Sequence, residues 1–91
     1  MSPMVRYRVV VSGRVQGVFF RDSCRRAAEE HDVGGWVRNL PDGRVEAVFE
    51  GPPADVGRVV DWARHGPRRA VVDDITLHPE PPEGLTTFRI R

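Results

Sequence analysis

Hydrophobic and polar residues alternate with a period of two in several short stretches of this chain. In the first, Val5, Tyr7, Val9 and Val11 share one face, which is typical of a half-buried strand. Five stretches predict strands in this way: residues 5–12, 36–40, 44–50, 71–78 and 86–91. In the fourth, Val71, Ile75 and Leu77 are expected on one face.

Two other stretches follow the helical period. The first covers roughly residues 21–32, and its apolar face consists of Phe20, Cys24, Ala27, Ala28 and His31. Its charged side offers two pairs at i, i+4, Arg25 with Glu29 and Arg26 with Glu30. The second places Asp55 in its first turn, and its stripe consists of Val56, Val59, Val60 and Ala63.

Glycine and proline separate these elements. Gly34 and Gly35 are expected to end the first helix, and the sequence 41–43 (Pro-Asp-Gly) predicts a turn that makes residues 36–50 a hairpin. Residues 51–53 end that hairpin, and residues 79–84 are expected to form a proline-rich loop.

The element order predicts a ferredoxin-like α+β sandwich. One apolar face per element implies an antiparallel sheet with two helices on one face. We expect the strand order 4-1-3-2, with a short extra C-terminal strand at an edge. The first two strands then run the same way, so the loop after residue 12 and Asn39 meet at one edge of the sheet.

The segment between the first strand and the first helix has the features of an anion site. A helix N-terminus presents unpaired N–H groups and the positive end of the helix dipole. Gly13 and Gly17 allow tight curvature and close approach to a ligand, and Arg21 could close over a phosphate. Some of its apolar side chains are expected to anchor the loop to the core while its amides face outward: Val15, Val18, Phe19 and Phe20. The alternative is an ordinary connection with a surface arginine.

Two motifs carry a resemblance to a known family. Gly13-x-Val15-Gln16-Gly17-Val18-x-Phe20-Arg21 resembles the first signature of the acylphosphatase family. Gly35-Trp36-Val37-Arg38-Asn39, followed by Asp42-Gly43-x-Val45-Glu46-Ala47 and Glu50-Gly51, is similar to the second. Both match at the family's catalytic positions and in its order, and the family pattern covers nearly the whole chain.

This resemblance implies hydrolysis of a carboxyl–phosphate anhydride to a carboxylate and inorganic phosphate. It implies that Arg21 and Asn39 are catalytic. It also implies a phosphate-binding loop of backbone amides from Val15, Gln16, Gly17, Val18, Phe19 and Phe20. We expect an acyl phosphate substrate, inorganic phosphate as product and competing ligand, a monomer, and no cofactor. The chain departs from the family at His31 and Asp32, where members often carry an aliphatic residue and a glycine.

Several of these residues have simpler interpretations. Asn39 could stabilise the turn that follows it, and Gln16 is better explained as a brace for the loop than as a ligand. Arg38 is expected to be solvated, and Cys24 to be a small core residue rather than a nucleophile. Three histidines lack ligand spacing, so no metal site is predicted: His31, His65 and His78.

Bulk composition narrows the function classes. Ninety-one residues suit one acylphosphatase-like domain over 1–91, and a net charge of +1 offers no broad basic surface for nucleic acid. No stretch is apolar enough for a membrane span, and a single cysteine suits a cytoplasmic protein. The alternative functions are a non-enzymatic ferredoxin-like module that binds RNA or a small anionic effector, and a domain serving a larger carbamoyl-phosphate-handling protein.

Overall fold

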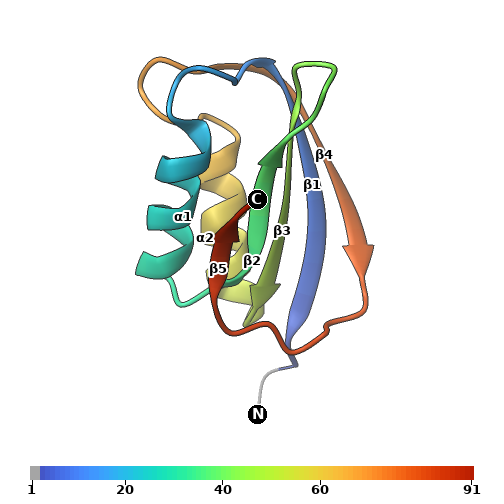
Figure 1. The fold of residues 1–91 in the computed structure, drawn as a ribbon. Coiled ribbons are helices and arrows are strands. Elements are labelled where there is room, and N and C mark those ends of the chain that lie inside the picture. The colour runs from blue at the N-terminus through green and yellow to red at the C-terminus, as the bar shows by residue number, and fades with distance from the viewer. Residues whose placement is uncertain (1–2) are drawn as a thin grey trace.

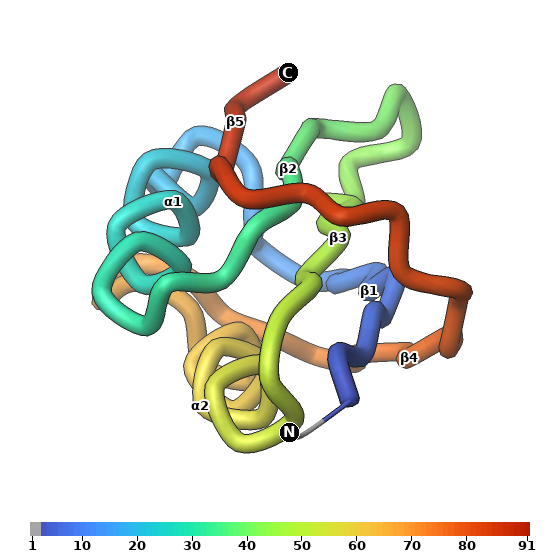
Figure 2. Tube along the Cα trace, turned by 90° about the horizontal axis from the view of Figure 1, so that it is seen from below, coloured from blue at the N-terminus to red at the C-terminus, as the bar shows by residue number. Residues whose placement is uncertain are grey.

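The computed structural model describes residues 3–91 as a five-stranded sheet with two helices on one of its faces (Figure 1). The elements are β1 (Val5–Arg14), α1 (Phe20–Glu30), β2 (Gly34–Asn39), β3 (Val45–Gly51), α2 (Pro53–Ala63), β4 (Val71–Glu80) and β5 (Phe88–Ile90). Seen along the strands, α1 and α2 lie side by side on the same side of the sheet (Figure 2). The ferredoxin-like prediction is confirmed.

The strands lie in the order β4-β1-β3-β2-β5, as predicted, with the last strand at an edge. The sheet is mixed rather than wholly antiparallel, because β5 pairs parallel to β2. After β4 the chain crosses the end of the sheet to the opposite edge (Figure 2). It therefore enters β5 from the same end at which β2 begins, and the two strands run in the same direction.

The core lies between the sheet and the helices and is built mostly from valine. The sheet contributes Val9, Val11, Val37, Val45, Ala47 and Phe49, and the helices contribute Cys24, Ala28, Val56, Val59, Val60 and Ala63. Phe49 stacks on Phe88 at 5.9 Å between ring centroids, which attaches β5 to this core. The predicted apolar faces of both helices are thus buried, except at His31, which follows α1 and is only partly buried. No helix within residues 3–91 is long and apolar enough to cross a membrane.

Gly34 and Gly35 belong to β2 rather than to the end of α1, contrary to expectation. A Cβ on Gly35 would overlap the backbone of Val48 in β3, and one on Gly34 would overlap the backbone of Leu85. Both positions therefore require glycine, because a neighbouring chain segment lies too close to leave room for a side chain.

The helix ends at Glu30, and Asp32 just after it adopts the left-handed conformation with φ 54°. The N–H of Val33 donates to Ala28 O at 2.8 Å, and the N–H of Asp32 donates to Glu29 O at 3.2 Å. These two bonds form the Schellman arrangement that satisfies the last helical carbonyls. An aspartate therefore occupies a position that favours glycine.

A β-bulge in β4 changes which of its side chains face the core. Ser12 pairs with Asp74 and Gly13 with Val72, which leaves Asp73 as an extra residue. The alternation shifts at this point, so Val72 packs against the core together with Ile75.

The expected common face of Val71, Ile75 and Leu77 is therefore wrong at Val71, which is 53% exposed. The strand also continues through Pro79, which was expected to lie in a loop. An edge strand tolerates proline because one side of it needs no partner.

Candidate active site

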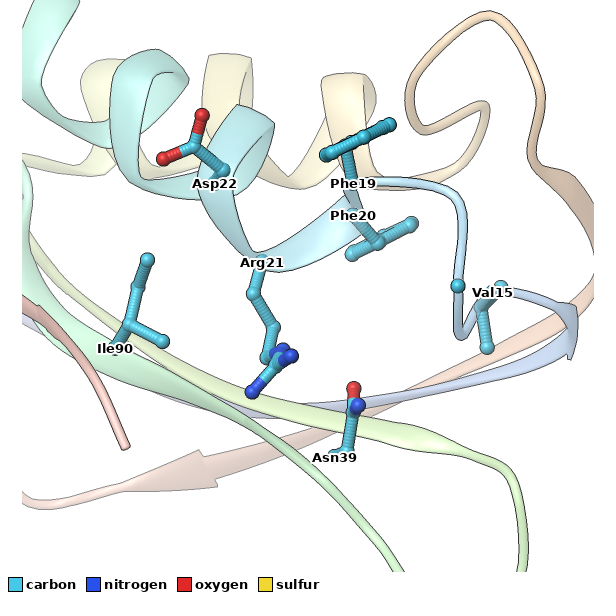
Figure 3. Close-up of a pocket in the computed structure, with 8 residues that line it drawn as sticks. Val15, Phe19, Phe20, Arg21, Asp22, Asn39 and Ile90 are labelled. Atoms are coloured by element: carbon cyan, nitrogen blue, oxygen red, sulfur yellow. The ribbon is translucent and has the colours of Figure 1, made fainter.

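The loop of residues 15–19 lies at the same end of the molecule as the β2–β3 hairpin (Figure 1). Between them is a pocket of about 410 Å³. It is lined by Val15, Gly17, Phe19, Phe20, Arg21, Asp22, Asn39 and Ile90. The predicted convergence of the first loop with the end of the second strand is therefore confirmed, and Arg21 and Asn39 point toward one another across the pocket (Figure 3).

Buried side chains hold the loop in place. Val15, Val18 and Phe20 are each less than 10% exposed, and the ring of Phe20 packs against Trp62 at 5.2 Å between centroids. Phe19 is the exposed member of the group: it is 75% exposed and takes the left-handed conformation with φ 63°. Gly17 also has a positive φ of 73°, with open space where a Cβ would lie.

Backbone donors of the loop have no acceptor within the described chain. The N–H groups of residues 16–19 form no hydrogen bond to any backbone or side-chain acceptor in residues 3–91. The N–H groups of the first turn of α1 likewise have no partner inside a helix. A set of free donors therefore surrounds the N-terminus of α1, where the helix dipole also favours negative charge.

Arg21 lies in the first turn of α1 and forms no ion pair with any residue of the described chain. The neighbouring carboxylate of Asp22 pairs instead with Arg25 at 3.4 Å and Arg26 at 3.3 Å. These pairs replace the ones expected with Glu29 and Glu30. The Arg21 guanidinium is consequently available to a ligand in the pocket.

Asn39 is the last residue of β2, and its side chain forms no hydrogen bond within residues 3–91. The following turn is held without it: the N–H of Leu40 donates to Arg44 O at 2.8 Å, and the Asp42 carboxylate accepts the N–H of Arg44 at 3.1 Å. The interpretation of Asn39 as a turn-stabilising residue is therefore wrong.

Gln16 connects the loop to the hairpin. Its Nε2 donates to Leu40 O at 2.8 Å and to Arg44 O at 3.0 Å. The side chain is thus a brace, as expected. Because Leu40 follows Asn39 directly, this brace also sets the distance between the loop and the hairpin that carries Asn39.

Other predicted residues lie away from the pocket. Gly13 faces β4, where a Cβ would collide with the backbone of Val71, so its role concerns the sheet rather than a ligand. Arg38 is paired with Glu46 at 2.7 Å rather than simply solvated. Cys24 is fully buried, and this burial raises the pKa of its thiol, as suits a core residue. Residues 3–91 contain no cluster of His, Cys, Asp and Glu that could hold a metal.

The contribution of Ile90 to the pocket wall was not predicted. Alternation in the last strand places Ile90 on the same side as Phe88, but only the pairing of β5 with β2 brings it to the pocket. No local pattern marks Phe19 as the exposed member of an apolar loop.

Comparison with known proteins identifies the family. The acylphosphatase family model matches residues 7–90. An acylphosphatase of Gloeobacter violaceus is 59% identical over 90 residues, which cover 99% of this chain and 97% of that protein. The structure of an acylphosphatase from Coxiella burnetii is 40% identical and superposes with a TM-score of 0.92, covering 97% of this chain and 93% of the other.

A part of a larger protein is also similar. The structure of T. kodakarensis HypF is 34% identical with a TM-score of 0.84, covering 96% of this chain but only 12% of that protein. The family match spans nearly every residue described above, including both motifs and the pocket between them. The chain belongs to the acylphosphatase family.

Proposed function

We propose that the chain hydrolyses the carboxyl–phosphate bond of acyl phosphates, with Arg21 and the loop amides holding the phosphoryl group and Asn39 orienting the attacking water. Family membership supports the activity. The observation that carries the residue roles is the free guanidinium of Arg21 beside the free carboxamide of Asn39, in one pocket with unpaired backbone donors.

The loop of residues 15–20 provides the phosphate cradle. Its N–H groups and the N-terminus of α1 supply fixed donors that need no rearrangement when charge develops on the phosphoryl oxygens. Arg21 adds a planar fork of donors that can bind two oxygens at once. Inorganic phosphate, the product, fits the same cradle and competes with the substrate.

Asn39 positions the nucleophile on the sheet side of the phosphoryl group. Its carboxamide can both accept a hydrogen bond from water and donate one, but it is too weak a base to remove the proton. The proton therefore passes to a phosphate oxygen of the substrate. A carboxylate is a good leaving group, so positioning and charge stabilisation suffice, without a covalent nucleophile.

An RNA-binding function is less well supported. On the open face of the sheet, Arg38 pairs with Glu46 and Arg8 pairs with Glu46 and Glu80, which offsets part of their positive charge. Trp36 is covered by the guanidinium of Arg91 at 4.3 Å from the ring centroid.

We also propose a cytoplasmic monomer of one domain over residues 1–91 that acts on a small molecule and not on nucleic acid or a membrane.

Replacement of the arginine tests this proposal. Arg21→Ala is expected to lower the turnover of benzoyl phosphate by about 100-fold or more, because one preorganised donor to the transition state is lost. Circular dichroism and thermal unfolding should show an intact fold. Arg58→Ala, which removes an exposed arginine of α2 far from the pocket, is the matched control and should keep wild-type turnover. Near-normal turnover by Arg21→Ala would refute the assigned role.

A further inference from the structure

We infer that three exposed arginines near the pocket, Arg14, Arg68 and Arg69, attract the negatively charged substrate and strengthen its binding through charge rather than through contact. We call these three residues the arginine rim. The inference rests on the proposed function, because it assumes that the phosphoryl group lies between Arg21, Asn39 and the loop amides. It extends that function by assigning residues to the capture of the substrate.

The fold brings the arginine rim to the phosphate cradle from two parts of the chain. Arg14 is the last residue of β1 and directly precedes the cradle. Arg68 and Arg69 belong to the connection between α2 and β4, which lies at the same end of the molecule (Figure 1). That connection packs against the cradle at Gly66, where a Cβ would come within 2.6 Å of the ring of Phe20. Residues that are more than fifty positions apart in the sequence therefore adjoin one phosphate site.

The charge of the arginine rim is not neutralised by ion pairs. All three side chains are exposed, and none of them forms an ion pair within residues 3–91. Asp73 and Asp74 follow in β4, but neither of them forms an ion pair with the rim. Together with the free guanidinium of Arg21, the rim outweighs these two carboxylates. The end of the molecule that holds the pocket is therefore positively charged.

Carboxylates gather at the opposite end, where α1 and β4 finish (Figure 1). They include Glu29, Glu30, Asp32, Glu50, Glu80 and Glu83. The last three of these share the guanidinium of Arg6, and the first three form no ion pair within residues 3–91. A net charge of +1 thus conceals a separation of charge along the molecule. Its field attracts anions to the end that carries the pocket.

The ligand of this site is suited to respond to such a field. The phosphoryl group of an acyl phosphate carries up to two negative charges at neutral pH, as does inorganic phosphate. Attraction between exposed charges extends over about 30 Å at 0.01 M ionic strength but only about 3 Å at 1 M. Because the arginine rim does not line the pocket, it acts on the affinity for the anion and not on the chemical step. The expected signature is a KM that depends on salt, with an unchanged kcat.

The test measures kcat and KM for benzoyl phosphate at ionic strengths of about 0.02 M and about 0.5 M. At the lower value, Arg68→Gln/Arg69→Gln should raise KM about 2-fold, and Arg68→Glu/Arg69→Glu, which reverses the charge, should raise it about 4- to 10-fold. At the higher value, both variants should lie within about 1.5-fold of wild type, because salt screens the field. Neither variant should change kcat.

The matched control is Arg58→Glu/Arg89→Glu, which changes the net charge equally at a distance from the pocket. Arg58 is an exposed residue of α2, and Arg89 lies on the open face of the sheet near Glu83. This variant should change KM by less than about 1.5-fold at either ionic strength, because both charges lie farther from the phosphate cradle.

Three results would each overturn the inference: a wild-type KM in Arg68→Glu/Arg69→Glu, an equal rise in the control variant, or a rise that persists at high ionic strength. Calorimetric titration with inorganic phosphate should show the same changes in Kd and does not require turnover. If phosphate binding follows this pattern while the wild-type protein fails to hydrolyse benzoyl phosphate, the hydrolytic function is overturned and the capture of anions is not.

Discussion

Asn39 has a free carboxamide because the turn after it satisfies its own hydrogen bonds. The backbone pair of Leu40 with Arg44 and the side chain of Asp42 hold the hairpin, so the geometry of the turn does not require an asparagine. The side chain is half-buried and faces Arg21 across the pocket (Figure 3). A residue with this combination of fixed position and free polar atoms is suited to aim a water molecule.

Asn39→Ala is therefore expected to reduce turnover of benzoyl phosphate by at least about 100-fold while leaving inorganic phosphate binding close to wild type. Steady-state kinetics and calorimetric titration with phosphate measure the two quantities. Simultaneous loss of turnover and phosphate affinity would show that Asn39 is a phosphate ligand or a structural residue.

The backbone conformation of Asp32 lowers the stability of the fold, and this effect is unrelated to the site. It occupies the left-handed position after α1, where a Cβ is unfavourable and glycine is not. Asp32→Gly should raise the free energy of unfolding by about 0.5–1 kcal/mol, since relief of strain exceeds the added entropy of the unfolded chain. Asp32→Ala should lower it. Urea denaturation gives both values, and a glycine variant less stable than wild type would contradict this account.

At the level of elements, the site depends on the contact between the β1–α1 loop and the β2–β3 hairpin. Gln16 makes that contact through two hydrogen bonds to hairpin carbonyls, across 24 and 28 residues of sequence. The loop carries the phosphate donors and the hairpin carries Asn39. Under the proposed function, Gln16 therefore helps to set the position of Asn39 relative to the loop.

Gln16→Leu should lower kcat by about 10-fold or more, because a small displacement of the hairpin misplaces the water relative to phosphorus. The affinity for inorganic phosphate should change much less, since the loop amides and Arg21 remain. Gln16→Glu keeps the size of the side chain but cannot donate, so it should behave like Gln16→Leu. A variant with lowered stability but unchanged kcat would show that the brace is only structural.

At the level of the whole molecule, a buried charged cluster at the end opposite the pocket holds the last segment in place. Glu50 is 1% exposed and accepts hydrogen bonds from the N–H groups of Glu83, Gly84 and Leu85 at 2.6–2.9 Å. Arg6, also buried, pairs with it at 3.4 Å. The chain between β4 and β5 is thereby fixed across the end of the sheet, and with it the strand that brings Ile90 to the pocket.

Glu50→Gln should lower the free energy of unfolding by about 2–4 kcal/mol. The substitution replaces a buried carboxylate, which accepts three backbone N–H groups, by a neutral amide. The NH₂ group of that amide would face at least one of these N–H donors. Glu80→Gln is the control. Glu80 also pairs with Arg6, at 3.0 Å, but it is partly exposed and accepts no backbone N–H, so about 1 kcal/mol or less is expected. Equal losses in the two variants would contradict a special role for Glu50.

The same carboxylate makes stability depend on pH. Burial alone would raise the pKa of Glu50, but the three N–H donors and Arg6 outweigh burial and hold it below its ordinary value of 4.5. A lowered pKa means that Glu50 stabilises the fold fully above that value and ceases to do so as the pH falls through its pKa in the folded state. The stability difference between wild type and Glu50→Gln should therefore shrink below about pH 4.5. A difference that persists unchanged to pH 2 would exclude this cause.

Local patterns accounted for most of the fold, and they failed where a contact joins distant segments. The alternation in β1 identified its core face, and the turn at residues 41–43 identified the hairpin. The same alternation misassigned Val71, because the bulge at Asp73 depends on the pairing of β4 with β1. It also gave no sign that Arg6 would be buried, because its partners lie 44 or more residues away.

By itself, the sequence determined the order of elements, the ferredoxin-like topology and the convergence of the loop with Asn39, because hydrophobic periodicity and turn chemistry act over a few residues. Its two motifs indicated the family by resemblance. Tertiary structure alone decided the parallel pairing of β5, the burial of Glu50 and Arg6, the brace from Gln16 and the exposure of Phe19. Each of these depends on which distant group fills the space beside a residue. Periodicity shows which face of an element is buried, but it does not show what packs against that face.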